Sequence, residues 1–263
     1  MRNRKWPLAV CAWLGLLTPA LRADEAFDKL MREFNEAQQS WGEKISKVQE
    51  SSTQPIDFEK LPPNPAKEFA QRFKAYAEQR KGKPEAIQAM VWLISAPLSQ
   101  QAGKPSEEQR WAFERLTADH AADAELGESL AGLQYAGWTV GRDPLVAFYE
   151  QVITQNKNND AKARAMLNLA LLLNEPQEMP GTKSDETKRA ADKKRADGLF
   201  RQIVKDYPKS RSAKPAENFI YELEHLQIGM AAPEIEGADA DGKKVALSQF
   251  KGQVVVLDFW GFW

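Results

Sequence analysis

The spacing of apolar residues changes once along the chain, at Gly229, and this change limits the possible folds more than any other feature. Upstream of it, apolar side chains recur every three or four positions, which is the period of amphipathic helices. The first such stripe is Phe27, Met31, Phe34, Gln38, Trp41, Ile45 and Val48. Alternation with period two is rare before residue 230, so residues 24–227 are predicted to form a helical domain without a sheet.

Breaks between the stripes divide this region into separate helices. Aromatic residues from Phe69 to Tyr76 predict one helix, which ends at Lys-Gly-Lys-Pro (81–84). The stripe from Ile87 to Ile94 predicts another, ended by Pro97. A further helix begins after Ser106, because serine at this position with glutamine three residues later approximates a capping box.

Composition excludes several classes of function. The 263 residues include 36 Lys and Arg against 37 Asp and Glu, so the net charge of −1 offers no basic face for a nucleic acid. One cysteine and two histidines exclude a disulfide framework and a Cys/His zinc site. His120 and Asp123 are one helical turn apart, but a single pair predicts an ordinary surface or core histidine. No metal and no cofactor are therefore predicted.

The N-terminus has the pattern of a secretory signal peptide over residues 1–23. Three positive charges in residues 1–5 precede an apolar run from Trp6 to Leu21, and Ala23 supplies a small residue before the acidic Asp24. The run is short for a membrane span, although an uncleaved anchor is the alternative. Removal of residues 1–23 would leave 32 basic and 37 acidic residues and no cysteine. The protein is thus expected to be exported to the periplasm or another extracytoplasmic space.

An internal repeat is present in the second half of the helical region. FYEQVITQ (148–155) resembles LFRQIVKD (199–206) at an offset of 51 residues, and the same offset pairs Ala165 with Ala216. Residues 176–194 between the copies are interpreted as an insertion of about 17 residues, which leaves about 34, the period of a tetratricopeptide (TPR) helix pair. The region is interpreted as a TPR-like domain, with a plain helical bundle as the alternative.

Beyond Gly229 the pattern is that of short strands. Residues 234–239 and 244–247 are predicted to form a hairpin around Ala240-Asp241-Gly242. The acidic turn lacks the ligand that a calcium loop needs at its twelfth position, where Phe250 stands, so a plain turn is predicted. The apolar run from Val254 to Trp260 is typical of a central strand buried on both faces.

These residues carry a resemblance to a known family. Gly229, Ala232-Pro233, Asp241-Gly242, Phe250-Lys251-Gly252, the apolar run and Phe259-Trp260 resemble, in this order, the start of the thioredoxin-like redoxins. The closest branch is the exported TlpA/ResA type, related to AhpC/TSA proteins. The resemblance covers about 35 residues, roughly a quarter of a redoxin domain. It implies that residues 228–263 are the N-terminal part of an α/β thioredoxin-like domain, with a hairpin and the first central strand.

The resemblance also implies roles for three residues. In this family the tryptophan that matches Trp263 is followed at once by Cys-x-x-Cys, whose first thiol has a lowered pKa at the start of a helix. Trp260 and Trp263 would pack beside this dithiol. Asp258 matches the buried aspartate of thioredoxins, which would relay a proton to the second cysteine. The alternative for Asp258 is an ordinary polar residue at a strand end.

Two functions of different classes follow. One is an exported thiol–disulfide oxidoreductase that acts on protein thiols or disulfides, with a helical domain that holds a partner protein. The other is a non-enzymatic helical-repeat scaffold with an inert redoxin segment. Because the sequence ends where the cysteine is expected, codon 264 is a candidate for a UGA triplet that encodes selenocysteine. A true stop codon and the edge of a sequenced fragment are the rival explanations.

Overall fold

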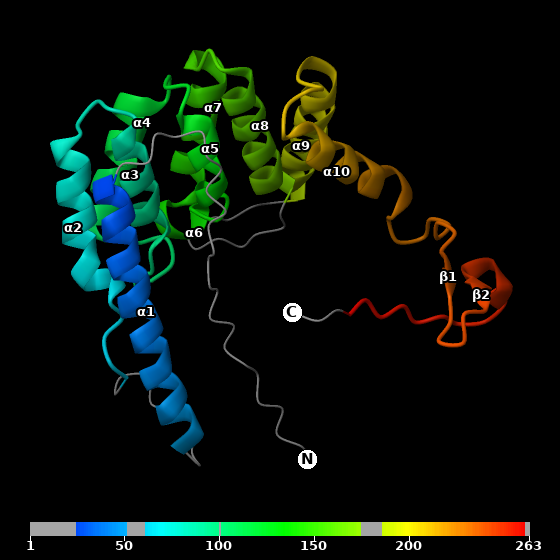
Figure 1. The fold of residues 1–263 in the computed structure, drawn as a ribbon. Helices are drawn as coiled ribbons and strands as arrows, with labels where there is room; N and C mark the ends of the chain where they lie inside the picture. Colours follow the sequence, from blue (N-terminus) through cyan, green and yellow to red (C-terminus); the bar gives the residue numbers. More distant parts are fainter. Residues whose placement is uncertain (1–24, 52–60, 100, 175–185, 261–263) are drawn as a thin grey trace.

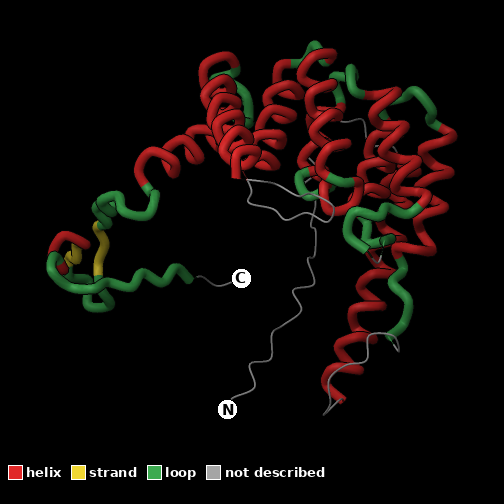
Figure 2. Tube along the Cα trace, turned by 180° about the vertical axis from the view of Figure 1, so that it is seen from behind, coloured by secondary structure: helices red, strands yellow, loops and turns green. Residues whose placement is uncertain are grey.

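A computed structural model of the chain describes residues 25–51, 61–99, 101–174 and 186–260. The described part is mainly helical, and its two strands form one small antiparallel sheet (Figures 1 and 2). The predicted signal peptide and Trp263 lie outside the described residues. The elements in chain order are α1 (Glu25–Ser51), α2 (Ala66–Gln79), α3 (Glu85–Ser95), α4 (Glu107–His120), α5 (Leu126–Ser129), η2 (Leu130–Leu133), α6 (Gly137–Val140), α7 (Arg142–Gln155), α8 (Asn159–Asn174), α9 (Glu186–Asp206), α10 (Ala213–His225), β1 (Glu236–Ala238), β2 (Lys244–Ala246) and η3 (Leu247–Phe250).

The helices α1, α2 and α3 are held together by aromatic side chains. Phe34 of α1 meets Trp92 of α3 edge-on at 4.9 Å between ring centroids, and Phe73 of α2 stacks on the same indole at 3.7 Å. Phe27 packs edge-on against Phe73. The predicted apolar stripe of α1 is thus confirmed as a packing face in its first half, where Phe27 and Phe34 pack against the next two helices, whereas Val48 at its end is exposed.

The predicted helix start at Ser106 is confirmed, and it also joins α4 to α3. The Ser106 hydroxyl accepts the Gln109 N–H, and Gln109 Oε1 accepts the Ser106 N–H at 2.9 Å. The Gln109 amide then donates to the carbonyl oxygens of Ile94 and Ala96 at the end of α3. One buried glutamine therefore satisfies polar groups at the start of one helix and at the end of another.

Two buried polar residues fix the short helices that precede α7. The Tyr149 hydroxyl donates to the carbonyl oxygen of Leu133 at 2.9 Å, and the Asn168 amide donates to that of Leu130 at 2.7 Å. Both carbonyl groups belong to η2, so these two side chains join η2 to α7 and α8. Burial raises the pKa of the Tyr149 phenol far above its ordinary value, so the hydroxyl remains a donor.

The two copies of the sequence repeat form two helix pairs, α7 with α8 and α9 with α10. Figure 1 shows the four helices in succession at one end of the array. Some residues related by the offset of 51 share their burial: Tyr149 and Phe200 are fully buried, as are Ala165 and Ala216. At these positions the two copies agree in burial as well as in sequence.

The structure describes only part of the predicted insertion between the copies. Residues 175–185 lie outside the described part, and residues 186–194 form the first turns of α9. The Arg142 guanidinium donates to Asp192 and that of Arg195 to Glu150, so both pairs bind this extension to α7. These contacts join residues 45 and 50 positions apart, so local sequence patterns do not reveal them.

Candidate functional site

The predicted hairpin is confirmed, with shorter strands than expected. Glu236 pairs with Ala246 and Ala238 with Lys244. Asp239 closes the turn, because its Oδ1 accepts the N–H groups of Asp241 and Lys243 at 3.0 and 2.9 Å. The carboxylate is occupied by the backbone, and no cluster of acidic, histidine or cysteine residues suited to a metal occurs among the described residues.

Glu234 joins the entry of the hairpin to the turn that follows it. Its Oε1 accepts the Ser248 N–H at 3.0 Å, and the Leu247 N–H donates to the Ile235 carbonyl oxygen at 2.9 Å. The hydrogen bonds from Ser248 lower the pKa of the Glu234 carboxyl below its ordinary value. The motif at residues 234–250 is therefore a local unit held by its own backbone and by the carboxylates of Glu234 and Asp239.

The prediction that residues 254–260 form a buried central strand is wrong for this structure. The segment is extended but has no strand partner, and Val254 and Val256 are 97% and 87% exposed. Within the same segment, Phe259 is 83% exposed and Trp260 is 75% exposed. A central strand needs neighbours on both edges, and the described part of the chain supplies only the two strands of the hairpin.

The structure places two of the three predicted site residues. Asp258 is exposed on the extended segment and forms no hydrogen bond or ion pair with another described residue. Trp260 lies two residues further along, whereas Trp263 is outside the described part. The structure therefore brings neither Asp258 nor Trp260 into a preformed site, and the proton relay stays a prediction.

His120 is fully buried in the helical part and was predicted to be an ordinary surface or core residue. It is a core residue, with Nδ1 at 2.7 Å from Asp123 Oδ2 and with Nε2 buried and unpaired among the described residues. Asn156 donates to the carbonyl oxygens of Ala121 and Asp123, which fixes the end of α4 against the turn between α7 and α8. The cluster supports packing between helices and supplies no metal ligand set.

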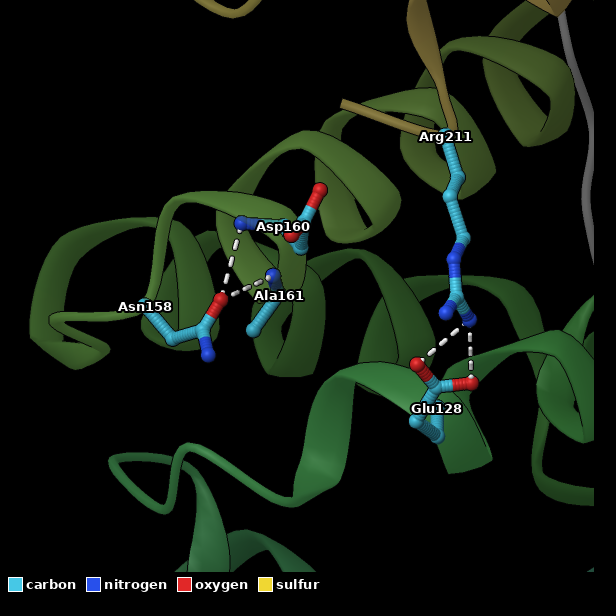
Figure 3. A network of polar contacts seen from close by, with 5 residues as sticks. All are labelled: Glu128, Asn158, Asp160, Ala161 and Arg211. Atoms are coloured by element: carbon cyan, nitrogen blue, oxygen red, sulfur yellow. Dashed lines mark hydrogen bonds and ion pairs between the residues drawn. The ribbon is translucent and has the colours of Figure 1, made fainter. Parts of the chain in front are cut away.

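A polar network beside this turn was not predicted (Figure 3). Asn158 Oδ1 accepts the N–H groups of Asp160 and Ala161 and so caps α8, a signal that the asparagine itself carries. Arg211, between α9 and α10, donates from Nη1 to both carboxylate oxygens of Glu128 in α5 at 2.5 and 2.8 Å. These two residues are 83 positions apart, so only the fold shows that they meet.

Comparisons with known proteins find one short similarity. No family model matches the chain, and no solved structure does. A stretch of 47 residues matches curated proteins. The relatives are thiol-disulfide oxidoreductases named ResA. The ResA proteins of Bacillus thuringiensis (strain Al Hakam) and Bacillus anthracis are both 43% identical over this stretch, and that of Bacillus cereus (strain ATCC 10987 / NRS 248) is 40% identical.

The ResA match is partial on both sides. It covers 18% of this chain and 27% of each of these relatives, so the chain spans about a quarter of the length of the proteins it matches. The match supports a relation to the thioredoxin-like proteins over that stretch alone. Separately, none of the helices in the described residues is both long and apolar enough to cross a membrane.

Proposed function

We propose that this chain belongs to an exported thiol–disulfide oxidoreductase of the thioredoxin-like type. The observation that carries the proposal is the 43% identity to ResA over 47 residues. The residues from Gly229 to Trp260 resemble the start of a redoxin in the same order, so we infer that the match falls on this part of the chain. The hairpin at residues 236–246 is consistent with that inference.

The proposed chemistry is exchange between a dithiol and a protein disulfide. A thiolate attacks one sulfur of the substrate disulfide, forms a mixed disulfide and releases the other sulfur as a thiolate. The second thiol then attacks the mixed disulfide, which leaves the substrate reduced and the enzyme oxidised. Residues 24–263 contain no cysteine, and the resemblance puts the dithiol directly after the position of Trp263. Trp260 would then pack beside it, and Asp258 would move the proton of the second thiol.

We assign the helical part a supporting role as a TPR-like unit that holds a protein partner. Its support is the repeat, in which Val152 and Ile203 occupy equivalent buried positions on α7 and α9. Helix pairs of this type stack into surfaces that bind other proteins. The alternative function, a binding scaffold with an inert redoxin segment, is favoured by the exposure of the apolar side chains from Val254 to Trp260.

The coding DNA beyond codon 263 decides between the two functions. A frame that continues with Cys-x-x-Cys, or with UGA followed by codons for x-x-Cys, supports the oxidoreductase. The extended protein should then reduce insulin disulfides with dithiothreitol as the electron source, whereas residues 24–263 alone should show no turnover. A continuation without this motif, or an extended protein that is inactive although folded, would leave the scaffold as the function.

A further inference from the structure

The outer faces of α8 and α10 differ although the helices occupy equivalent places in the repeat. One stripe of α8 is buried and apolar, and it consists of Ala163, Met166, Leu167, Ala170 and Leu173. The offset of 51 maps these positions onto exposed and mostly polar residues of α10, which are Lys214, Glu217, Asn218, Tyr221 and Glu224. The members are three or four positions apart, so each set lies along one side of its helix.

The inner faces of the two helices do not differ in this way. Ala165 and Ala216 are both buried, and Ile220 of α10 packs against the core as its counterpart Leu169 does. Phe219 stacks on Phe200 of α9 at 5.0 Å between ring centroids. The change from apolar to polar is therefore confined to the outer side, where α8 has α9 as a further neighbour and α10 faces solvent (Figure 1).

We propose that this outer stripe of α10 is an end cap that prevents another helix pair, including one from a second copy of this chain, from stacking there. Stacking would remove the carboxylates of Glu217 and Glu224 from water without partners on the incoming helix, which is strongly unfavourable. Both carboxylates are already paired on the surface, Glu217 with Lys214 at 3.2 Å and Glu224 with Arg201 at 2.9 Å. Polar terminal helices of this kind keep a repeat array soluble and closed.

The end cap restricts where a protein partner of the helical part binds. Among the described residues, the row of packed helices ends at α10, and the chain continues from there to the hairpin. A protein partner must therefore bind to a face of the helices other than the outer stripe of α10. This inference rests on the repeat and on burial alone, and it does not depend on the redox function.

The test introduces apolar residues of the outer stripe of α8 at the equivalent positions of α10 in the full chain. The triple variant Glu217→Met, Asn218→Leu and Glu224→Leu places the side chains of Met166, Leu167 and Leu173 at the equivalent outer positions. We expect sedimentation velocity over a concentration series to show new self-association, with a dimer dissociation constant lowered by at least about tenfold relative to the unchanged chain. Circular dichroism checks that the helices are retained.

A double variant of α10 and a matched control variant of α4 complete the test. The variant Glu217→Met with Asn218→Leu preserves the Arg201–Glu224 ion pair and should associate in the same direction, more weakly. The matched control Glu107→Met, Arg110→Leu and Glu114→Leu adds three apolar side chains to an exposed stripe of α4 and should not associate beyond the unchanged chain. Folded α10 variants that associate no more than the control would overturn the proposal.

Discussion

Arg142 at the start of α7 donates from Nη2 to Asp192 Oδ2 of α9 at 2.7 Å, across 50 positions of sequence. The side chains are only 11% and 19% exposed, so this pair is largely shielded from solvent. The neighbouring pair between Arg195 and Glu150 is exposed on both sides. Both ion pairs join α7 to α9, and they differ mainly in the burial of their side chains. Comparing them therefore measures how burial changes the stability that an ion pair contributes.

We expect the buried pair to stabilise the fold more than the exposed pair. A double-mutant cycle of Arg142→Ala and Asp192→Ala should give a coupling free energy of about 1–2 kcal/mol, because removal of one partner leaves the other charge poorly solvated. The cycle of Glu150→Ala and Arg195→Ala should give less than about 1 kcal/mol. Urea unfolding of the six variants measures both values, and equal couplings would contradict this account of α9.

Gln109 should contribute more stability than the cap residue Ser106. Ser106→Ala removes one side-chain cap and should cost about 1 kcal/mol. Gln109→Leu leaves the carbonyl oxygens of Ile94 and Ala96 without their donor and should cost about 2–3 kcal/mol. Gln39→Leu on the exposed side of α1 is the control and should change the free energy of unfolding by less than about 0.5 kcal/mol. The reverse order of the first two variants would show that Gln109 does not join α3 to α4.

Shortening the chain after Gln227 should improve solubility without loss of helical stability. The run from Val254 to Trp260 is largely apolar, extended and exposed, which favours association between chains. Light scattering during heating should show less aggregation, while the thermal midpoint followed by circular dichroism stays the same. Unfolding of the shortened chain would mean that the C-terminal segment packs against the helices and that the boundary at 227/228 is wrong.

The contact between Glu234 and Ser248 should weaken in acid. The Glu234 pKa is lowered in the folded state, so the carboxylate stabilises the motif above its unfolded pKa and loses this effect as the pH falls through the folded pKa. The Ser248 amide resonance should therefore shift as the pH falls through this lowered pKa, at a more acidic pH than an ordinary glutamate carboxyl requires. Glu234→Gln should abolish that step, whereas a step that persists in this variant would assign it to another group.

Much of the helical part could be predicted because its signals are local. The stripe from Phe27 to Val48 and the pair Ser106 and Gln109 involve residues within a few turns of each other, so they were visible in the sequence. The turn at Asp241-Gly242 was visible for the same reason, because glycine readily adopts the positive φ of +80° seen at Gly242. The resemblance to redoxins likewise rested on ordered local motifs.

The residues of the candidate site could be predicted from the sequence, but their surroundings in the fold could not. Asp258 and Trp260 were recognised from their neighbours along the chain, but their environment depends on other strands. A run such as Val254 to Trp260 is compatible with a buried strand and with an exposed extended segment, since the apolar pattern is the same in both. In the structure, residues 254–260 form an exposed extended segment.

The sequence by itself determined the apolar stripe of α1, the cap at Ser106 and the hairpin turn, because each depends on residues separated by one or a few helical turns or by one strand. The repeat was visible in the sequence because two local patterns are alike. Only the tertiary structure decided which residues of these elements meet. It brings Arg142 to Asp192 and Arg211 to Glu128, and it places Asn156 against the end of α4 beside His120. Such contacts form between groups tens of residues apart, and their free energy exists only once the chain has brought them together.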